Sequence, residues 1–202
     1  MFVLTIDQAG SRSTTDRIPD LLDLLAPIPT ALPWERSVGD EAQGALTRAR
    51  DVVDAVLLCL RSGGWYVGIG IGGVEEPFPR SPREARGSAL VAARRAVERA
   101  KKTGERAPLA VEAPDGGARA AAEAEGVLAL LGRHVLGRSE AEWRILDLLQ
   151  PGERGTQTAV ARTLGISPQA VSKAAARAAW HEEHAVRPAA ARLLAWADAG
   201  AT

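Results

Sequence analysis

The sequence predicts an α+β domain followed by an all-α domain, and three observations lead to this prediction. In the first half of the 202 residues, short apolar runs typical of strands alternate with stretches of helical periodicity. In the second half, apolar residues recur at helical spacing. Between the halves, Pro114–Gly117 has the composition of a turn or boundary. We therefore predict domains at residues 1–114 and 139–202, joined by an alanine-rich helix at 115–138.

The first half is predicted to follow the order β-α-β-β-α-β-α-β, the split βαβ or ferredoxin-like arrangement βαββαβ. In the fourth strand, glycine occupies every second position from Gly68 to Gly72, so another element or a ligand can approach that face of the backbone. The predicted strands are Phe2–Ile6, Trp34–Val38, Ala45–Thr47, Trp65–Ile71 and Leu109–Glu112, and the helices are a segment capped by Asp16, one opening at Asp51, and Arg86–Lys102.

The second half is predicted to consist of five helices. Its most specific signal is a pair of short helices separated by Gly165-Ile166, the layout of a helix-turn-helix. Ser167 and Pro168 suit the cap and first residue of the second helix of this pair. The expected helices are Ala118–Val135, Ser139–Leu149, Thr156–Leu164, Ser167–Ala179 and Pro188–Ala199, with Ala159, Val160, Leu164, Val171, Ala174 and Ala175 in the helix-turn-helix core.

The outer surface of this helix pair is predicted to bind double-stranded DNA. From 154 to 180 the chain has four cations and no acid, which suits a phosphate backbone. Glutamine suits adenine, and lysine suits guanine or phosphate. Bundles with similar turns also occur in protein-binding modules, which is the alternative. The predicted phosphate contacts are Arg154, Arg162 and Arg177, and the residues placed near base edges are Gln169, Ser172 and Lys173; Ser167 also belongs to the predicted DNA-binding set.

Two adjacent acids, Asp40 and Glu41, lie between Gly39 and Gly44, which predicts a tight turn with carboxylates at its tip. Asp7 ends the first predicted strand. If the two strands are neighbours in one sheet, the three acids converge and offer oxygen ligands to Mg²⁺ and a phosphate-bearing molecule. The alternative is a solvated surface turn.

Ser11 and Arg12, in a polar loop after the first strand, are candidate phosphate ligands, or they belong to a loop that caps the next helix.

Gly68–Gly73 fits the dinucleotide pattern G-x-G-x-x-G, but residues 74–79 form an acidic, proline-containing loop where that pattern requires a helix. The excess of cations at 75–106 is interpreted as a solvated helix face, with contacts to a DNA backbone or to an anionic ligand as alternatives. His181–His184 is also interpreted as solvated, because two histidines lack a third zinc ligand.

Residues 1–112 resemble the palm fold of GGDEF-type nucleotide cyclases and polymerase-like cyclases, and they are more similar still to the SatD family. The family pattern Asp-x-x-Gly-Ser-Arg corresponds to Asp7–Arg12, its Gly-Asp-Glu-Phe-Gln-Gly turn to Gly39–Gly44, and its Gly-Ile-Gly strand to Gly68–Gly70. In actinobacterial DNA-binding relatives a helix-turn-helix follows this domain. The resemblance implies that Asp7 is a metal ligand and that Lys101 contacts a phosphate.

Departures from the cyclase pattern bear on chemistry. Ala42 replaces an aromatic residue of the turn, Val38 replaces its first glycine, and Glu105 replaces an arginine where it would repel a triphosphate. They argue against turnover and leave ligand or metal binding open.

The composition sets further limits. Net charge is zero, so partners must be inferred from local charge, and the single Cys59 permits no disulfide within the chain. Neither a leader nor an apolar run near 18 residues is evident. We expect a cytoplasmic transcriptional regulator without a membrane partner, and a homodimer, because helix-turn-helix proteins commonly bind paired half-sites. Its first domain would act as sensor, oligomerisation module or scaffold. The alternative is a Mg²⁺-dependent nucleotidyl-transfer or cyclase enzyme with a DNA-binding appendage.

Overall fold

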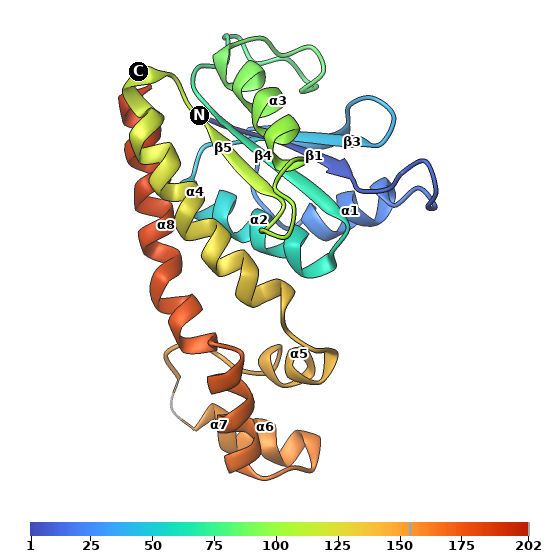
Figure 1. The fold of residues 1–202 in the computed structure, drawn as a ribbon, viewed down its shortest axis with the longest axis vertical. Helices are drawn as coiled ribbons and strands as arrows, with labels where there is room; N and C mark the ends of the chain where they lie inside the picture. The colour runs from blue at the N-terminus through green and yellow to red at the C-terminus, as the bar shows by residue number, and fades with distance from the viewer. Residues whose placement is uncertain (154, 202) are drawn as a thin grey trace.

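The computed structural model describes residues 1–153 and 155–201, and its fold is α+β. The five strands of its mixed sheet run in the spatial order β2-β3-β1-β4-β5 (Figure 1). All neighbours are antiparallel except β4 and β5, which are parallel. The predicted order of strands and helices in the first half is confirmed. The strands are β1 (Phe2–Gln8), β2 (Leu32–Arg36), β3 (Glu41–Leu46), β4 (Trp65–Ile71) and β5 (Leu109–Glu112).

Helices cover both faces of the sheet. Alternate residues of a strand point to opposite faces, so Leu4 and Ile6 enter the larger core, whereas Val3 packs toward the other face. On the larger-core side lie α1 (Ile18–Leu25), α2 (Ala49–Ser62), α4 (Asp115–Leu136) and the second half of α8 (Trp180–Gly200), and on the other lies α3 (Ser88–Ala100). Each large side chain buried in this way contributes about 1.5–3 kcal/mol.

The glycines of β4 bring α3 directly onto the strand. A Cβ at Gly70 would lie 2.1 Å from the Ala89 carbonyl oxygen, and one at Gly68 would lie 2.3 Å from the Val97 nitrogen. The expectation that another element approaches this face is therefore confirmed. Residues 72–87 form a loop before α3, so no helix follows the glycines in the way a dinucleotide site requires.

The β2–β3 hairpin differs from its prediction. Strand β3 begins at Glu41 rather than Ala45, so Glu41 lies in the sheet and only Asp40 remains in the turn. The cause is non-local, because β1 pairs with β3 from Asp7 opposite Glu41 to Phe2 opposite Leu46. Gly44 is a strand residue, and its missing side chain makes room for the Trp34 ring.

Helix α8 begins at Trp180 and continues through Pro188, so its predicted start at Pro188 was wrong. Residues near its end pack beneath the sheet, where Ala190, Leu194 and Ala197 are buried in the larger core. The Met1 amine forms an ion pair with Asp198, and the two chain ends lie close together in Figure 1. The packing therefore unites α4 and α8 with the first half of the chain.

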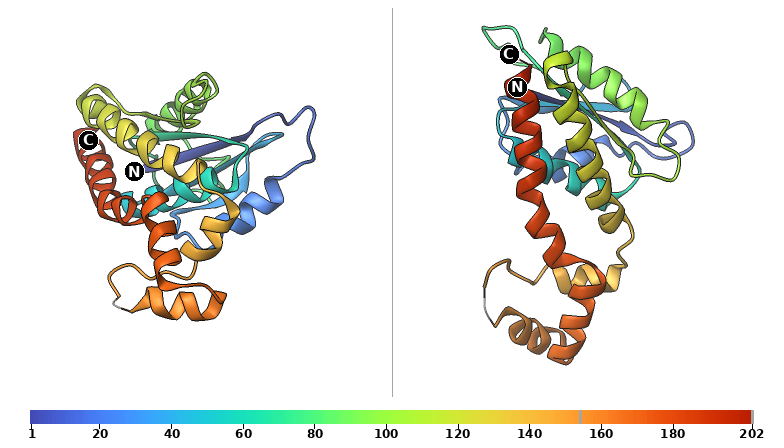
Figure 2. Two further views of the ribbon diagram at one scale, coloured as in Figure 1. Left: turned by 60° about the horizontal axis from the view of Figure 1, so that its bottom comes forward. Right: turned by 60° about the vertical axis from the view of Figure 1, so that its left-hand side comes forward.

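A smaller core holds together α5 (Glu140–Leu146), α6 (Thr156–Leu164) and α7 (Pro168–Arg177) at the end of the molecule distant from the sheet (Figure 2). The predicted bounds of α6 are confirmed. Val171, Ala174 and Ala175 are buried as expected, but Ala159 is exposed and Ala161 takes its place in the core.

Leu128, Leu131 and Val135 of α4 are buried within the larger core, so the apolar face of this helix packs inside the molecule. Cys59 is fully buried, and burial raises the pKa of its thiol to about 12, which makes it unreactive.

None of the helices in the described part of the chain combines the length and apolarity needed to cross a membrane.

Candidate functional sites

The helix pair α6–α7 has a turn with well-defined local causes. Gly165 ends α6 in the left-handed conformation, with φ of 65°, which glycine adopts without steric cost. Ser167 then caps α7, because its Oγ accepts a hydrogen bond from the Ala170 N–H at 3.1 Å. Pro168 occupies the first turn of α7, where a missing N–H costs nothing.

The residues predicted to contact DNA lie on the outer side of this pair. Neither α6 nor α7 contains an acidic residue. Arg177 is partly neutralised, because its Nε lies 3.5 Å from Glu142 Oε1 of α5. Arg154 lies outside the described residues. The exposed members of the predicted set are Arg162, Ser167, Gln169, Ser172, Lys173 and Arg177.

A second candidate site, which we call the acidic edge, consists of Asp7, Asp40 and Glu41. Asp7 and Glu41 face each other across β1 and β3, and the Asp40 carbonyl accepts a hydrogen bond from the Gln8 N–H at 3.0 Å. The structure therefore brings the three predicted acids into one region. Lys101 joins them, with its Nζ 2.9 Å from Asp7 Oδ2.

The surroundings of Asp40 and Glu41 shift the pKa values of these two acids in opposite directions. A hydrogen bond from Ser11, aided by the charges of Lys101 and Arg12, lowers the pKa of Asp40. Ser11 and Arg12 thus lie near the turn acid. Burial raises the pKa of Glu41, and the nearby Arg94 guanidinium compensates only in part.

Arg94 is the residue that the sequence interpretation missed at this site. Its Nη1 donates to Glu41 Oε2 at 2.9 Å, although the cations of this segment were interpreted as a solvated face. The available signal was its position on α3, two helical turns before Lys101 and on the same side. The two cations reach Glu41 and Asp7 respectively.

The acidic edge does not fit a metal ion in this arrangement. Within residues 1–153 and 155–201, no group of three histidine, cysteine, aspartate or glutamate side chains is placed to hold one. Lys101 and Arg94 already hold the carboxylates of Asp7 and Glu41. Glu41 Oε1, in contrast, is buried without a hydrogen-bond partner in the described part of the protein.

A groove of about 610 Å³ adjoins this region and is lined by Ser37, Val38, Gln43, Pro82, Arg83, Ala85, Leu90, Val91, Arg94 and Arg95.

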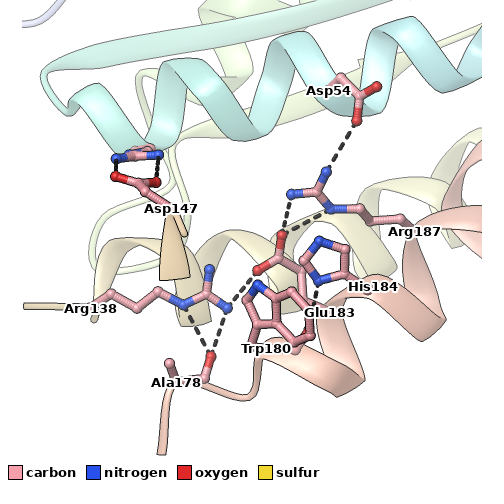
Figure 3. A network of polar contacts seen from close by, with 9 residues as sticks. Asp54, Arg138, Asp147, Ala178, Trp180, Glu183, His184 and Arg187 are labelled. Carbon is pink, nitrogen blue, oxygen red and sulfur yellow. Dashed lines mark hydrogen bonds and ion pairs between the residues drawn. The ribbon is translucent and has the colours of Figure 1, made fainter. Parts of the chain in front are cut away.

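A buried charge network connects the helix pair to the sheet domain (Figure 3). Its centre is Glu183 of α8, whose side chain is only 2% exposed. The predicted solvated segment at residues 181–184 is therefore wrong for Glu183, although His181 and Glu182 are exposed. Glu183 Oε2 lies 2.5 Å from Arg138 Nη2 in an ion pair that lacks hydrogen-bond alignment. Its Oε1 accepts from Arg187 Nε at 2.9 Å.

Both arginines extend this network beyond α8. Arg138 Nε donates to the Ala178 carbonyl oxygen at 3.0 Å, just beyond α7, and Arg187 Nη1 lies 3.2 Å from Asp54 Oδ1 on α2. Although burial opposes ionisation, the hydrogen bonds and charges of the two arginines lower the pKa of Glu183. The network is therefore a charged connection between α7 and α2.

Comparison with known proteins adds no assignment: no family model, curated protein or solved structure has significant similarity to the chain.

Proposed function

We propose that the protein is a transcriptional regulator that binds double-stranded DNA through α6 and α7, with the α+β part as a palm-like sensor or oligomerisation domain. The observation that carries the proposal is the exposed, acid-free outer surface of α7 behind a glycine turn. A buried α7 would have excluded the proposal. Since the pair lies at the end of the molecule distant from the sheet, a duplex can approach it without displacing another element (Figure 1).

The exposed side chains have distinct roles in this proposal. Gln169, Ser172 and Lys173 occupy the first two turns of α7, the part of a recognition helix that reaches base edges. Arg162 and Arg177 contact phosphates, and so does Arg154. Phosphate contacts supply affinity and position, whereas contacts to base edges discriminate between sequences. A homodimer would place two such helices on paired half-sites.

The proposal is tested by selecting bound fragments from random duplex DNA and measuring their affinity by fluorescence anisotropy at several salt concentrations. We expect Lys173→Ala to weaken binding about tenfold or more, and affinity to fall steeply as salt rises, because bound arginine and lysine release counterions from the duplex. Gln169→Ala should change the selected sequence more than the affinity for random DNA.

A matched control is Lys102→Ala, which removes an exposed lysine at the end of α3, far from the helix pair. Its affinity for the selected duplex should equal that of the unmodified protein. Binding that does not depend on salt, or equal losses in Lys102→Ala and Lys173→Ala, would contradict the proposal.

The second candidate function is Mg²⁺-dependent nucleotidyl transfer or cyclisation at the acidic edge, with DNA binding as an accessory. One observation favours it, namely the buried Glu41 oxygen that has no hydrogen-bond partner in the described part of the chain. Because Lys101 and Arg94 hold the other carboxylate oxygens, we draw no reaction step through a metal. Incubation with each nucleoside triphosphate and Mg²⁺ distinguishes the candidates: a product that disappears in Asp40→Ala supports the enzyme.

A further inference from the structure

A hollow lies between α2 and α8, close to the buried charge network and separate from the acidic edge. It consists of two adjoining cavities of about 460 and 490 Å³ that share Arg50, Asp54, Pro151, His184 and Arg187 in their walls. We call the two together the junction cavity. Cavities of this size accommodate small organic molecules, and proteins often bind such molecules where two parts of the fold meet.

One side of the junction cavity is apolar. These side chains come from α2, α4, α5 and the loop after α1, so the wall depends on how the helices pack together. Its members are Ile28, Leu57, Leu58, Val135 and Trp143. Leu57 and Val135 are buried, and Arg61 and Arg138 lie over the Trp143 ring at 4.1 and 4.8 Å from its centroid. The apolar surface open to a flat ring therefore comes mainly from Ile28 and Leu58, together with Pro188 and Ala191 of the adjoining cavity.

On the polar side of the cavity, positive charges outnumber negative ones. Arg187 is held by Glu183 and Asp54, and Arg61 donates two hydrogen bonds to Asp147, at 2.7 and 2.6 Å. Arg50, by contrast, makes no ion pair with any described residue. In and around the cavity, Arg50, Arg61, Arg138 and Arg187 face only three carboxylates, those of Asp54, Asp147 and Glu183, so one positive charge is left over.

We propose that the junction cavity binds a small aromatic monoanion, with its ring against the apolar wall and its carboxylate paired with Arg50. A guanidinium can donate two parallel hydrogen bonds to a carboxylate, which gives the pairing direction as well as affinity. The apolar wall contributes through ring burial, at about 25 cal/mol per Å² of apolar surface removed from water. A neutral ring lacks the first contribution, and a charge without a ring lacks the second.

The position of the cavity also predicts regulation, and this part of the inference rests on the proposed DNA binding. An anion beside Arg50 lies next to Arg187, so it competes with Asp54 for the guanidinium that connects α8 to α2. An occupied cavity therefore alters how α8 is held against the sheet domain. The ligand then changes DNA affinity through its different affinities for two arrangements of the protein.

The test is calorimetric titration of the full chain with 2-naphthoate and with its neutral isostere 2-naphthamide. We expect one molecule of 2-naphthoate to bind per chain and the amide to bind about tenfold more weakly, because it lacks the charge that pairs with Arg50. Arg50→Ala should weaken naphthoate binding about tenfold and leave amide binding unchanged. Circular dichroism checks that this variant of an exposed residue is folded.

Arg95→Ala is the matched control, because Arg95 is an exposed arginine that lines the groove beside the acidic edge. It should bind 2-naphthoate as the unmodified protein does. The inference is overturned if naphthoate shows no saturable binding, if the amide binds equally well, or if Arg95→Ala loses affinity while Arg50→Ala keeps it. The titration needs no DNA, so its failure is distinguishable from failure of the proposed function; the regulatory part is tested by repeating the anisotropy measurement with saturating naphthoate.

Discussion

Glu41 and Glu183 are two buried carboxylates with opposite electrostatic behaviour. Their side chains are 4% and 2% exposed, and each contacts an arginine from elsewhere in the chain. Each keeps one carboxylate oxygen without an aligned hydrogen bond in the described structure. Glu41 pairs with one arginine, Arg94, and is also affected by Ser37 and the charge of Lys101, whereas Glu183 pairs with both Arg138 and Arg187. Burial raises the pKa of Glu41, and the two arginines lower the pKa of Glu183 despite burial.

The two buried acids differ in how closely cations surround them, and the pKa of each shifts accordingly. Burial disfavours the charged form of both carboxyls; it dominates at Glu41, whereas the hydrogen bonds and charges of two arginines outweigh it at Glu183. Glu183 therefore has a structural role, while Glu41 remains able to accept another donor.

The largest effect is expected for Glu183→Gln. This change removes the charge that compensates Arg138, whose side chain is 2% exposed, and leaves a buried guanidinium without an anion. We expect the free energy of unfolding to fall by about 3–5 kcal/mol, measured by urea denaturation. The neighbouring Glu182→Gln, at an exposed position, is the control and should be neutral. A loss below about 1 kcal/mol in Glu183→Gln would refute the structural role.

The stabilising effect of Glu183 should depend on pH. Because its pKa is lower in the folded protein than its ordinary value of 4.5, its contribution is complete above 4.5 and disappears as the pH falls toward the folded value. The difference in stability between the unmodified protein and Glu183→Gln should therefore shrink below pH 4.5. Denaturation of both proteins across this range provides the measurement, and a constant difference would contradict the assignment.

Glu41→Gln should have a smaller effect, with the opposite pH dependence. Because the pKa of Glu41 is raised, its stabilising contribution is complete below 4.5 and is lost as the pH rises through the folded value. At neutral pH we expect the variant to equal the unmodified protein or exceed its stability by up to about 1 kcal/mol, since Arg94 is 58% exposed and can be hydrated. A loss of stability that grows with pH would show that Glu41 resembles Glu183 instead.

The smallest effect is expected for Asp54→Asn, which weakens the outermost link of the network. Both Asp54 and Arg187 are about one-third exposed, so solvent screens their ion pair. We expect a loss of no more than about 1 kcal/mol. A double-mutant cycle with Arg187→Ala measures the pair alone, and a coupling as large as the Glu183→Gln effect would place the centre of the network at Asp54 instead.

Much of the fold could be predicted because its determinants are local. The turn at Gly165 and the cap at Ser167 specify α6 and α7 within a few residues, and the glycines of β4 indicate close packing by another element. The α+β order follows from periodicity in the same way. Glu41 could not be placed correctly, because its strand is defined by pairing with β1 rather than by its own neighbours.

The candidate site was predictable only in part for a related reason. Asp7 and Lys101 were both named, but as ligands for different partners, whereas the structure pairs them with each other. The Glu183 network joins residues that are far apart in sequence, including Arg138 and Asp54, and no local pattern indicates such a contact. The helix through Pro188 was missed because proline usually marks a helix start or break, and here tertiary packing maintains the helix.

The 21 residues of α8 have a mechanical consequence. At 1.5 Å per residue this helix is about 30 Å long, with one end buried beneath the sheet and the other beside α7. If the helix turned as a straight rod, a tilt of about 10° at the buried end would displace the far end by about 5 Å. That displacement would exceed the spacing of one base pair, about 3.4 Å, so under the proposed DNA binding a small rotation at the buried end would be enough to take α7 out of register with a duplex.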